Sequence, residues 1–346
     1  MSVPTDPAPT EARTGNPAVM SAIVTSVRDA APAAPAVSPS RFAAGHDNPM
    51  RGMGLMIGAV FLFASMDALV KMAAETYPTG QIVFFRNFVA FLPLSIFIAR
   101  AGGLSVLRTR RLGGHLIRGA VGLSAMVCFF LSYKLLPLGE AVALGMAGPL
   151  FITALSVPFL GEKVGIRRWS AVVVGFVGVL VMTRPGSGIF DAYALIPLAG
   201  AFFLGLAMVM VRSLSRSEHS ATIVFYFTIT ATLASAASLP WQWVTPDWAG
   251  LFLLVAIGLI GGCAQFTMTQ AFRLAPAALV APFEYLALVF AIGYGFAFWA
   301  EVPDLWLMAG AVIVVASGIY ILHREAVRAR EQAAAARVAA TVTDIP

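Results

Sequence analysis

Residues 135–186 read LLPLGEAVALGMAGPLFITALSVPFLGEKVGIRRWSAVVVGFVGVLVMTRPG and carry the strongest structural signal in the chain. They contain two apolar runs, 138–160 and 169–183 with its flanks, joined by Gly-Glu-Lys at 161–163. Each run approaches the ~20 apolar residues that a helix needs to cross a bilayer. Pro149 lies in the middle of the first run, where it frees a backbone carbonyl. Because a bare carbonyl is costly in hydrocarbon, we expect this part of a membrane hairpin to face protein or a wet cavity.

The same hairpin recurs 139 residues later in the chain without a gap. Residues 133–137 align with residues 272–276, and Glu162 aligns with Glu301. Other pairs at the same offset are Gly119 with Gly258, Gly122 with Gly261, Phe151 with Phe290 and Val173 with Val312. Self-similarity on this scale indicates a duplicated half.

These motifs resemble the EamA-type transporters of the drug/metabolite transporter superfamily. The resemblance covers roughly residues 51–324. It rests on Pro-Leu-Gly-Glu-Ala at 137–141, Pro-Leu-Phe at 149–151, Gly-Glu-Lys at 161–163, Arg168-Trp169, the run 175–179 leading into Arg184-Pro185-Gly186, and Arg86 followed by Ala90. The resemblance implies ten helices, two inverted five-helix repeats and transport of a solute.

The composition places the chain in the helical membrane class. Of its 346 residues, 59% are apolar and 12% are charged, and the mean hydropathy is +0.84. A soluble core of this composition is implausible, so the lipid bilayer is an expected partner. The net charge of +6 comes mainly from basic residues in loops and tails, which argues for membrane orientation and against nucleic-acid binding. Cys128 and Cys263 lack metal-ligand spacing, and no cofactor is expected.

The expected organisation has four parts. Residues 1–50 are rich in Pro, Ala, Ser and Thr and are predicted to be a disordered cytoplasmic tail. The first repeat, helices 1–5, covers residues 51–186, and the second, helices 6–10, covers residues 187–323. Residues 324–346 form a basic cytoplasmic C-terminal tail, whose Ala-rich sequence should extend the last helix onto the membrane surface.

The sequence predicts an all-α polytopic membrane protein. Charge clusters and Pro or Gly breaks mark the ends of its spans. The predicted spans are 53–73, 80–99, 115–134, 139–160, 167–183, 192–211, 219–240, 248–271, 277–299 and 304–322. Ten spans place both tails on one side, and the loops of that side carry most of the Lys and Arg, whereas Lys71, Lys134 and Arg184 fall on the other. The positive-inside rule therefore predicts a bacterial-type inner membrane protein with both termini cytoplasmic. Five spans per repeat is an odd number, so the second repeat should be inverted relative to the first.

Ionisable residues inside the membrane are expensive and mark functional sites by default. Asp67 in the first span and Arg86 in the second lie at similar depth, and we expect them to pair and to contact the solute. The alternative is a purely structural ion pair, helped by Lys71 four residues after Asp67.

The second half contributes three further candidates for substrate binding, namely Glu284, Tyr285 and Gln265. Glu284 follows Pro282, which opens the backbone hydrogen-bond ladder, and its counterpart in the first half is Gly145. A carboxyl that breaks the symmetry of the duplication indicates a role of its own. The alternatives are a Glu284 carboxyl held by Gln265 for packing alone, and a Gln265 that belongs to a packing stripe of small residues.

Two other groups of charged residues have structural interpretations. Glu162 and Glu301 end their helices where the helix dipole disfavours an anion, so each needs a nearby donor to close its hairpin. His115 and Arg118 enter the third span near its predicted cytoplasmic end, from which they are expected to snorkel to the surface.

The favoured function is secondary transport of a small polar or amphoteric metabolite by alternating access between the repeats. The family resemblance suggests an amino acid, riboflavin or a compound like S-adenosylmethionine. A coupling proton is a further expected partner, because Glu284 either binds the cationic part of the solute or exchanges a proton that couples transport to the proton gradient. The alternatives are a membrane-embedded enzyme and a non-transporting scaffold. The sequence contains no phosphate-binding G-x-x-x-x-G-K-[ST] loop and no H-E-x-x-H or G-x-S-x-G motif, which argues against an ATP-driven pump and against an enzyme.

Overall fold

The computed structural model describes residues 49–160, 164–184, 192–215, 217–275 and 277–343. Every regular element within these ranges is a helix. The elements are α2 (Pro49–Ala74), α3 (Thr79–Ala101), η1 (Gly103–Leu107), α4 (Leu112–Leu135), α5 (Leu138–Gly145), α6 (Gly148–Leu160), α7 (Ile166–Thr183), η2 (Ala192–Ala194), α8 (Leu195–Leu214), α9 (Ser220–Gln242), α10 (Trp248–Leu274), α11 (Ala277–Val280), η3 (Ala281–Tyr285), α12 (Leu286–Trp299) and α13 (Leu305–Thr343).

Ten of the helical segments in the described ranges are long and apolar enough to cross a membrane, which confirms the predicted all-α fold with ten spans. The fourth segment, Leu138–Leu160, combines α5 and α6, and the ninth, Ala281–Trp299, combines η3 and α12. The last helix does not stop at the end of its apolar part. As the Ala-rich sequence predicted, α13 continues through the basic segment to Thr343.

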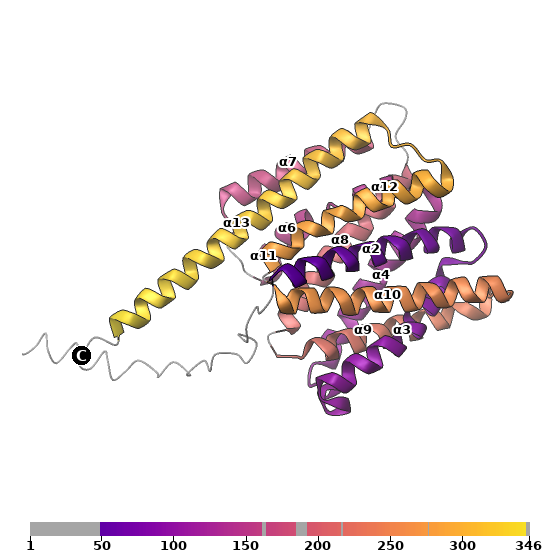
Figure 1. Cartoon of the computed structure of the whole chain (residues 1–346), viewed down its shortest axis with the longest axis horizontal. Helices are drawn as coiled ribbons and strands as arrows, with labels where there is room; N and C mark the ends of the chain where they lie inside the picture. The colour runs from indigo at the N-terminus through magenta and orange to yellow at the C-terminus, as the bar shows by residue number, and fades with distance from the viewer. Residues whose placement is uncertain (1–48, 161–163, 185–191, 216, 276, 344–346) are drawn as a thin grey trace, which may run out of the picture. The chain divides into compact units, whose positions relative to one another are not determined.

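The helices pack in pairs that bring together segments far apart in the sequence. α2 packs against α10 and α4 against α8, while α3 packs against α9 and α7 against α13 (Figure 1). The α7–α13 contact is close because it is built on glycines: a Cβ added to Gly310 would lie 2.5 Å from the carbonyl oxygen of Gly178. Small residues of this kind let membrane helices approach at backbone distance.

Two spans are interrupted, and the interruptions occupy equivalent positions in the duplicated sequence. α5 ends at Gly145 and α6 begins at Gly148, so the helix breaks just before Pro149. In the second half, the short 3₁₀ segment η3 contains Pro282 and separates α11 from α12. The predicted opening of the backbone near both prolines is therefore confirmed.

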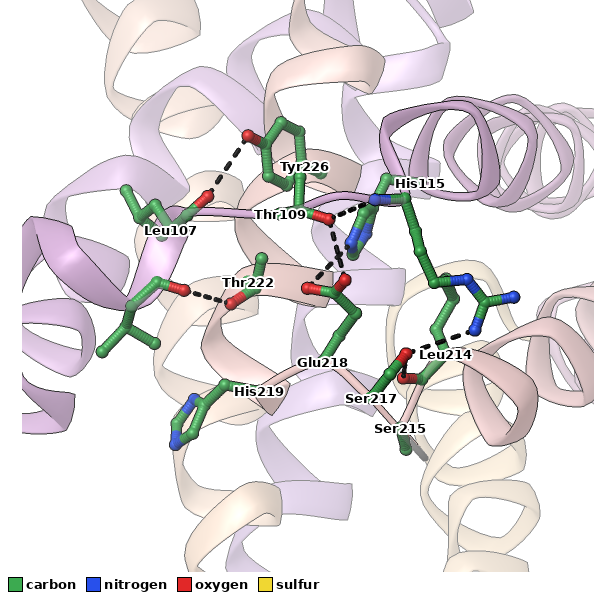
Figure 2. Close-up of polar contacts among 12 residues, drawn as sticks. Leu107, Thr109, His115, Leu214, Ser215, Ser217, Glu218, His219, Thr222 and Tyr226 are labelled. Carbon is green, nitrogen blue, oxygen red and sulfur yellow. Dashed lines mark hydrogen bonds and ion pairs between the residues drawn. The ribbon is translucent and has the colours of Figure 1, made fainter.

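At one end of the bundle, which we call the Glu218 end, the loop before α4 is fastened to the start of α9 (Figure 2). Thr109 Oγ1 donates to Glu218 Oε1 at 2.8 Å, and the Tyr226 hydroxyl donates to the Leu107 carbonyl at 3.2 Å. Glu218 Oε2 also lies 3.6 Å from Nε2 of His115, whose ring stacks on Tyr226 with centroids 4.8 Å apart. The prediction that His115 snorkels is wrong, because its side chain is fully buried between these partners.

The opposite end, which we call the Glu301 end, holds the alternate loops together. The Gln81 side chain donates to the Val244 carbonyl at 2.8 Å and accepts from the Val244 N–H at 3.0 Å. Lys71 Nζ donates to the Leu136 carbonyl at 2.8 Å. The loops named here, all within the described residues, thus fall at alternate ends of the bundle, as consecutive spans require.

Candidate functional site

A cavity of ≈ 680 Å³ lies among the helices and reaches both interrupted spans. Its wall takes residues from α2, α4, α5, α6, α8, α10, η3 and α12. At one extreme it includes Asp67 and Tyr133, and at the other it includes Arg212 and Ser215 at the Glu218 end of α8. Most of its surface is apolar, with a small number of polar groups, as is usual for sites that bind small molecules.

Both helix breaks line this cavity, through residues that are equivalent in the duplicated sequence. Gly145 and Glu284 both line it, and so do their successors Met146 and Tyr285, which are equivalent at the 139-residue offset. The backbone break therefore shapes the wall in both halves, whereas the carboxyl occurs in only one of them. Interrupted helices in corresponding positions are the usual location of a transporter's binding site.

Asp67 projects into the cavity from α2. Its carboxyl interacts with the Tyr133 hydroxyl of α4 and, more weakly, with the charge of Arg86. Among the described residues, Asp67 and Arg86 form no direct ion pair, and Arg86 Nη1 instead donates to Asn87 Oδ1 at 3.1 Å. The expected pairing of Asp67 with Arg86 is thus an electrostatic interaction without contact. Lys71 pairs with Glu301 instead.

Glu284 lies in η3 with its side chain exposed to the cavity. Within the described part of the chain, its carboxyl has no hydrogen-bond or ion-pair partner, so Gln265 does not hold it. The neighbouring Tyr285 also lines the cavity, but its hydroxyl points toward Gly318 of α13, where it is buried without a hydrogen-bond partner. Glu284 is therefore available to a solute from the cavity side.

Arg86 and Gln265 lie elsewhere, in a separate cavity of ≈ 90 Å³. This second cavity also contains Arg118, which was expected from the sequence to snorkel to the surface. That prediction is wrong, because the Arg118 guanidinium lies 4.3 Å from the centre of the Phe227 ring and its Nε and Nη1 are buried. The available sequence signal was Gly122, one turn later on the same face, which leaves room for the side chain.

At the Glu301 end, polar contacts join α2, the start of α5 and the end of α12. Lys71 Nζ lies 2.5 Å from Glu301 Oε1, and Glu301 Oε2 accepts from the Leu138 N–H at 2.8 Å. Lys71 also lies 5.2 Å from the centre of the Trp299 ring. Glu301 thus has the donors that its position at a helix end was predicted to need, while Glu162 lies outside the described residues.

Tyr133 separates the main cavity from a third hollow, which lies at the Glu301 end and is distinct from the cavity that contains Arg86. It lines the main cavity on one side and, on the other, a hollow of ≈ 370 Å³ whose wall includes Lys71, Trp299 and Glu301. The Lys71–Glu301 pair therefore lies on the far side of Tyr133 from Glu284.

The ten apolar helices define a multi-pass membrane protein. The chain belongs to the EamA-like transporter family, which matches it twice, at residues 50–184 and 192–323. The two matches agree with the duplication seen in the sequence, and the family resemblance is confirmed.

Three relatives with assigned functions are transporters. The chain is 35% identical to the pseudopaline exporter CntI of Pseudomonas aeruginosa, covering 78% of this chain and 94% of that protein. It is 28% identical to a riboflavin transporter of Vibrio cholerae, with 82% and 97% covered, and 26% identical to an S-adenosylmethionine uptake transporter of Rickettsia felis, with 80% and 94% covered. A solved crystal structure covers 78% of this chain and 95% of its own at a TM-score of 0.56 and 19% identity, which supports the fold alone. Family and relatives thus indicate a transporter of small metabolites rather than an enzyme.

Proposed function

We propose that this protein is a secondary transporter that moves a small polar or amphoteric metabolite across the bacterial inner membrane by alternating access. The observation that carries the proposal is the main cavity. It is lined by the equivalent helix breaks of both halves and lies behind the Lys71–Glu301 contacts at one end. A closed end opposite an accessible cavity is the arrangement that alternating access requires.

The packing of the helices supports an inverted repeat. The 139-residue offset makes α2 equivalent to α8 and α4 equivalent to α10. Exchanging equivalent helices turns the α2–α10 contact into the α8–α4 contact, and both contacts occur. The α3–α9 and α7–α13 contacts map onto themselves under the same exchange. A pseudo-two-fold axis relating the two halves accounts for all four.

In this proposal the structure represents the state open to the cytoplasm. The main cavity reaches Arg212 and Ser215, which lie beside the loop of the Glu218 end. That end carries the basic loops assigned to the cytoplasm by the positive-inside rule. The Lys71–Glu301 pair then closes the outer face.

We assign substrate contact to Asp67, Glu284 and Tyr285. Two carboxyl groups on one apolar cavity favour a solute with a cationic group, and the apolar remainder suits an aromatic or aliphatic body. Arg86 acts on this site from behind Asp67, through its charge. Glu284 either binds the cationic group or exchanges a proton that couples transport to the proton gradient.

The class of solute follows from the size and chemistry of the cavity. A volume of ≈ 680 Å³ is in the range of sites that hold whole metabolites, ~300–1,000 Å³. Amino acids and S-adenosylmethionine carry the cationic group that two carboxyls would favour. Riboflavin would rely on the apolar wall instead.

The test is transport by purified protein in proteoliposomes. Labelled amino acids, S-adenosylmethionine and riboflavin are offered in counterflow, with protein-free liposomes as the control. We expect accumulation of at least one solute, and we expect Tyr133→Trp, which would fill the cavity at Asp67, to reduce it. A membrane enzyme would convert a solute instead of accumulating it, and a scaffold would do neither.

A further inference from the structure

The second cavity, of ≈ 90 Å³, lies between α3, α4, α9 and α10, apart from the main cavity. α10 separates the two, with Met268 facing the main cavity and Gln265 facing the second. Arg86 and Arg118 both line the second cavity, and none of its described lining residues is Asp or Glu. Two arginines thus line a cavity inside a membrane bundle, and no acidic residue among the described lining balances their charge.

Arg118 is held in place without being neutralised. Its guanidinium lies over the Phe227 ring, which offsets part of the cost of burying the charge. Its Nε and Nη1 are nevertheless buried without a hydrogen-bond partner. Buried donors that remain unpaired are destabilising, so these two nitrogens are free to bind an acceptor in the cavity.

Arg86 of α3 also has a guanidinium nitrogen without a hydrogen-bond partner. The residue is only 9% exposed, and its Nη1 donates to Asn87 Oδ1, whereas its Nε is buried without a hydrogen-bond partner. The Asn87 amide nitrogen donates to the Val83 carbonyl at 2.8 Å, so the amide oxygen is oriented to accept from Arg86.

The charges around the second cavity do not cancel. Arg86 and Arg118 interact unfavourably with each other through their like charges. Asp67 is the acidic group that interacts with Arg86, but it lines the main cavity and makes no direct ion pair with Arg86 in the described part of the chain. Arg86 therefore has one distant carboxyl as its counter-charge and repels Arg118, an arrangement that an additional anion would stabilise.

We propose that the second cavity is a binding site for a small oxyanion, a carboxylate or a phosphate, held between Arg86 and Arg118. The planar guanidinium fork matches the oxygens of either group. Gln265 adds an amide that can donate to the same ligand. The second cavity, at ≈ 90 Å³ against ≈ 680 Å³ for the main cavity, has room for such a group. This site does not depend on the proposed transport.

The test uses the full-length protein purified in detergent. Its thermal unfolding midpoint is measured against sodium acetate and sodium phosphate, with sodium chloride at matched ionic strength in parallel. A bound ligand raises the midpoint in a saturable way, so we expect saturable stabilisation by acetate or phosphate beyond that by chloride. The anion that saturates at the lower concentration identifies the preferred oxyanion.

Arg118→Gln is the decisive variant, and Arg100→Gln, an exposed arginine in the last turn of α3, is its control. We expect Arg118→Gln to weaken the apparent anion affinity by at least about tenfold, the effect of losing a charged hydrogen-bond donor. Arg100→Gln should respond as the wild type does. In anion-poor buffer, Arg118→Gln should unfold no earlier than the wild type, because it removes one of two repelling cations.

Arg118→Lys keeps the positive charge but removes the planar guanidinium. We expect this variant to lose most of the preference for oxyanions over chloride. The proposal is overturned if acetate and phosphate act like chloride at equal ionic strength. It is equally overturned if Arg118→Gln keeps the saturable response of the wild type.

Discussion

Lys71 of α2 and Glu301, which follows α12, form an ion pair with Nζ and Oε1 2.5 Å apart. The two residues are 230 positions apart and belong to different family matches. Both side chains are largely buried, and Glu301 also accepts from the Leu138 N–H. One carboxylate thus ties α2, the start of α5 and the end of α12 together at a single point.

Removing one member of this pair should destabilise the protein more than removing both. Lys71→Met and Glu301→Gln each leave the other charge largely buried and unpaired, so we expect each to lower the thermal midpoint. The double variant should recover part of the loss, with a coupling of roughly 0.5–3 kcal/mol. The measurement is thermal unfolding of the four proteins in one detergent.

Asp304→Asn is the matched control for that cycle. Asp304 pairs with Arg184 at the same end of the bundle, but both side chains are substantially exposed. Its loss should cost only about 0–1 kcal/mol, as is usual for surface pairs. Strictly additive losses of Lys71 and Glu301 would mean that the pair contributes nothing beyond its separate contacts.

Gly310→Ala should destabilise the α7–α13 contact. A Cβ at position 310 would lie 2.4 Å from Met182 Cγ and 2.5 Å from the Gly178 carbonyl oxygen, so the helices must separate. Overpacking of this kind costs ~1–3 kcal/mol. Gly293→Ala in α12, where nothing lies within 4 Å of the added carbon, is the control. Equal thermal midpoints for the two variants would contradict the close approach of these helices.

Asp67 and Arg86 should be energetically coupled although they do not touch. Asp67→Asn leaves the charge of Arg86 without its nearest acid, and Arg86→Gln leaves Asp67 without its cation. We expect each single variant to reduce transport and thermal stability more than the double variant does. Additive losses in both assays would show that the two charges act independently.

Glu284→Gln should separate the two roles proposed for this carboxyl, because Gln keeps the shape and loses the charge. Loss of gradient-driven uptake with solute exchange retained would indicate proton coupling. Loss of both activities with an unchanged thermal midpoint would indicate solute binding. A variant that transports like the wild type at every pH has lost nothing, and the assignment of Glu284 to the site then fails.

The sequence was sufficient to predict the spans and the two helix breaks, because both depend on local properties. Apolar length determines a span in lipid, and Pro149 and Pro282 lack the N–H that an uninterrupted helix would use at their positions. The duplication also made Gly145 and Glu284 equivalent, and the two residues line one cavity.

The tertiary partners could not be predicted in the same way. In the structural alternative, Lys71 would support Asp67 one turn away, but the fold brings Glu301 to Lys71 from the other half of the chain. Gln265 and Met268 differ by three positions in α10 and nevertheless face different cavities. The direction of each polar face depends on the rotation of its helix in the bundle, which hydropathy leaves undetermined.

Alternating access is tested most directly by the side from which the main cavity can be reached. Met146→Cys places a thiol on the cavity wall, in a background where the exposed Cys263 and the half-buried Cys128 are replaced by Ser. A membrane-impermeant thiol reagent is applied to spheroplasts and to inside-out vesicles, with and without Glu301→Gln.

We predict rapid labelling from the cytoplasmic side and slow labelling from outside while the Lys71–Glu301 pair is intact. Glu301→Gln should raise the outside rate by about tenfold, which corresponds to ~1.4 kcal/mol of bias between the two states, and lower the inside rate. Labelling of the introduced thiol at equal rates from both sides, or an outside rate that Glu301→Gln leaves unchanged, would contradict the account.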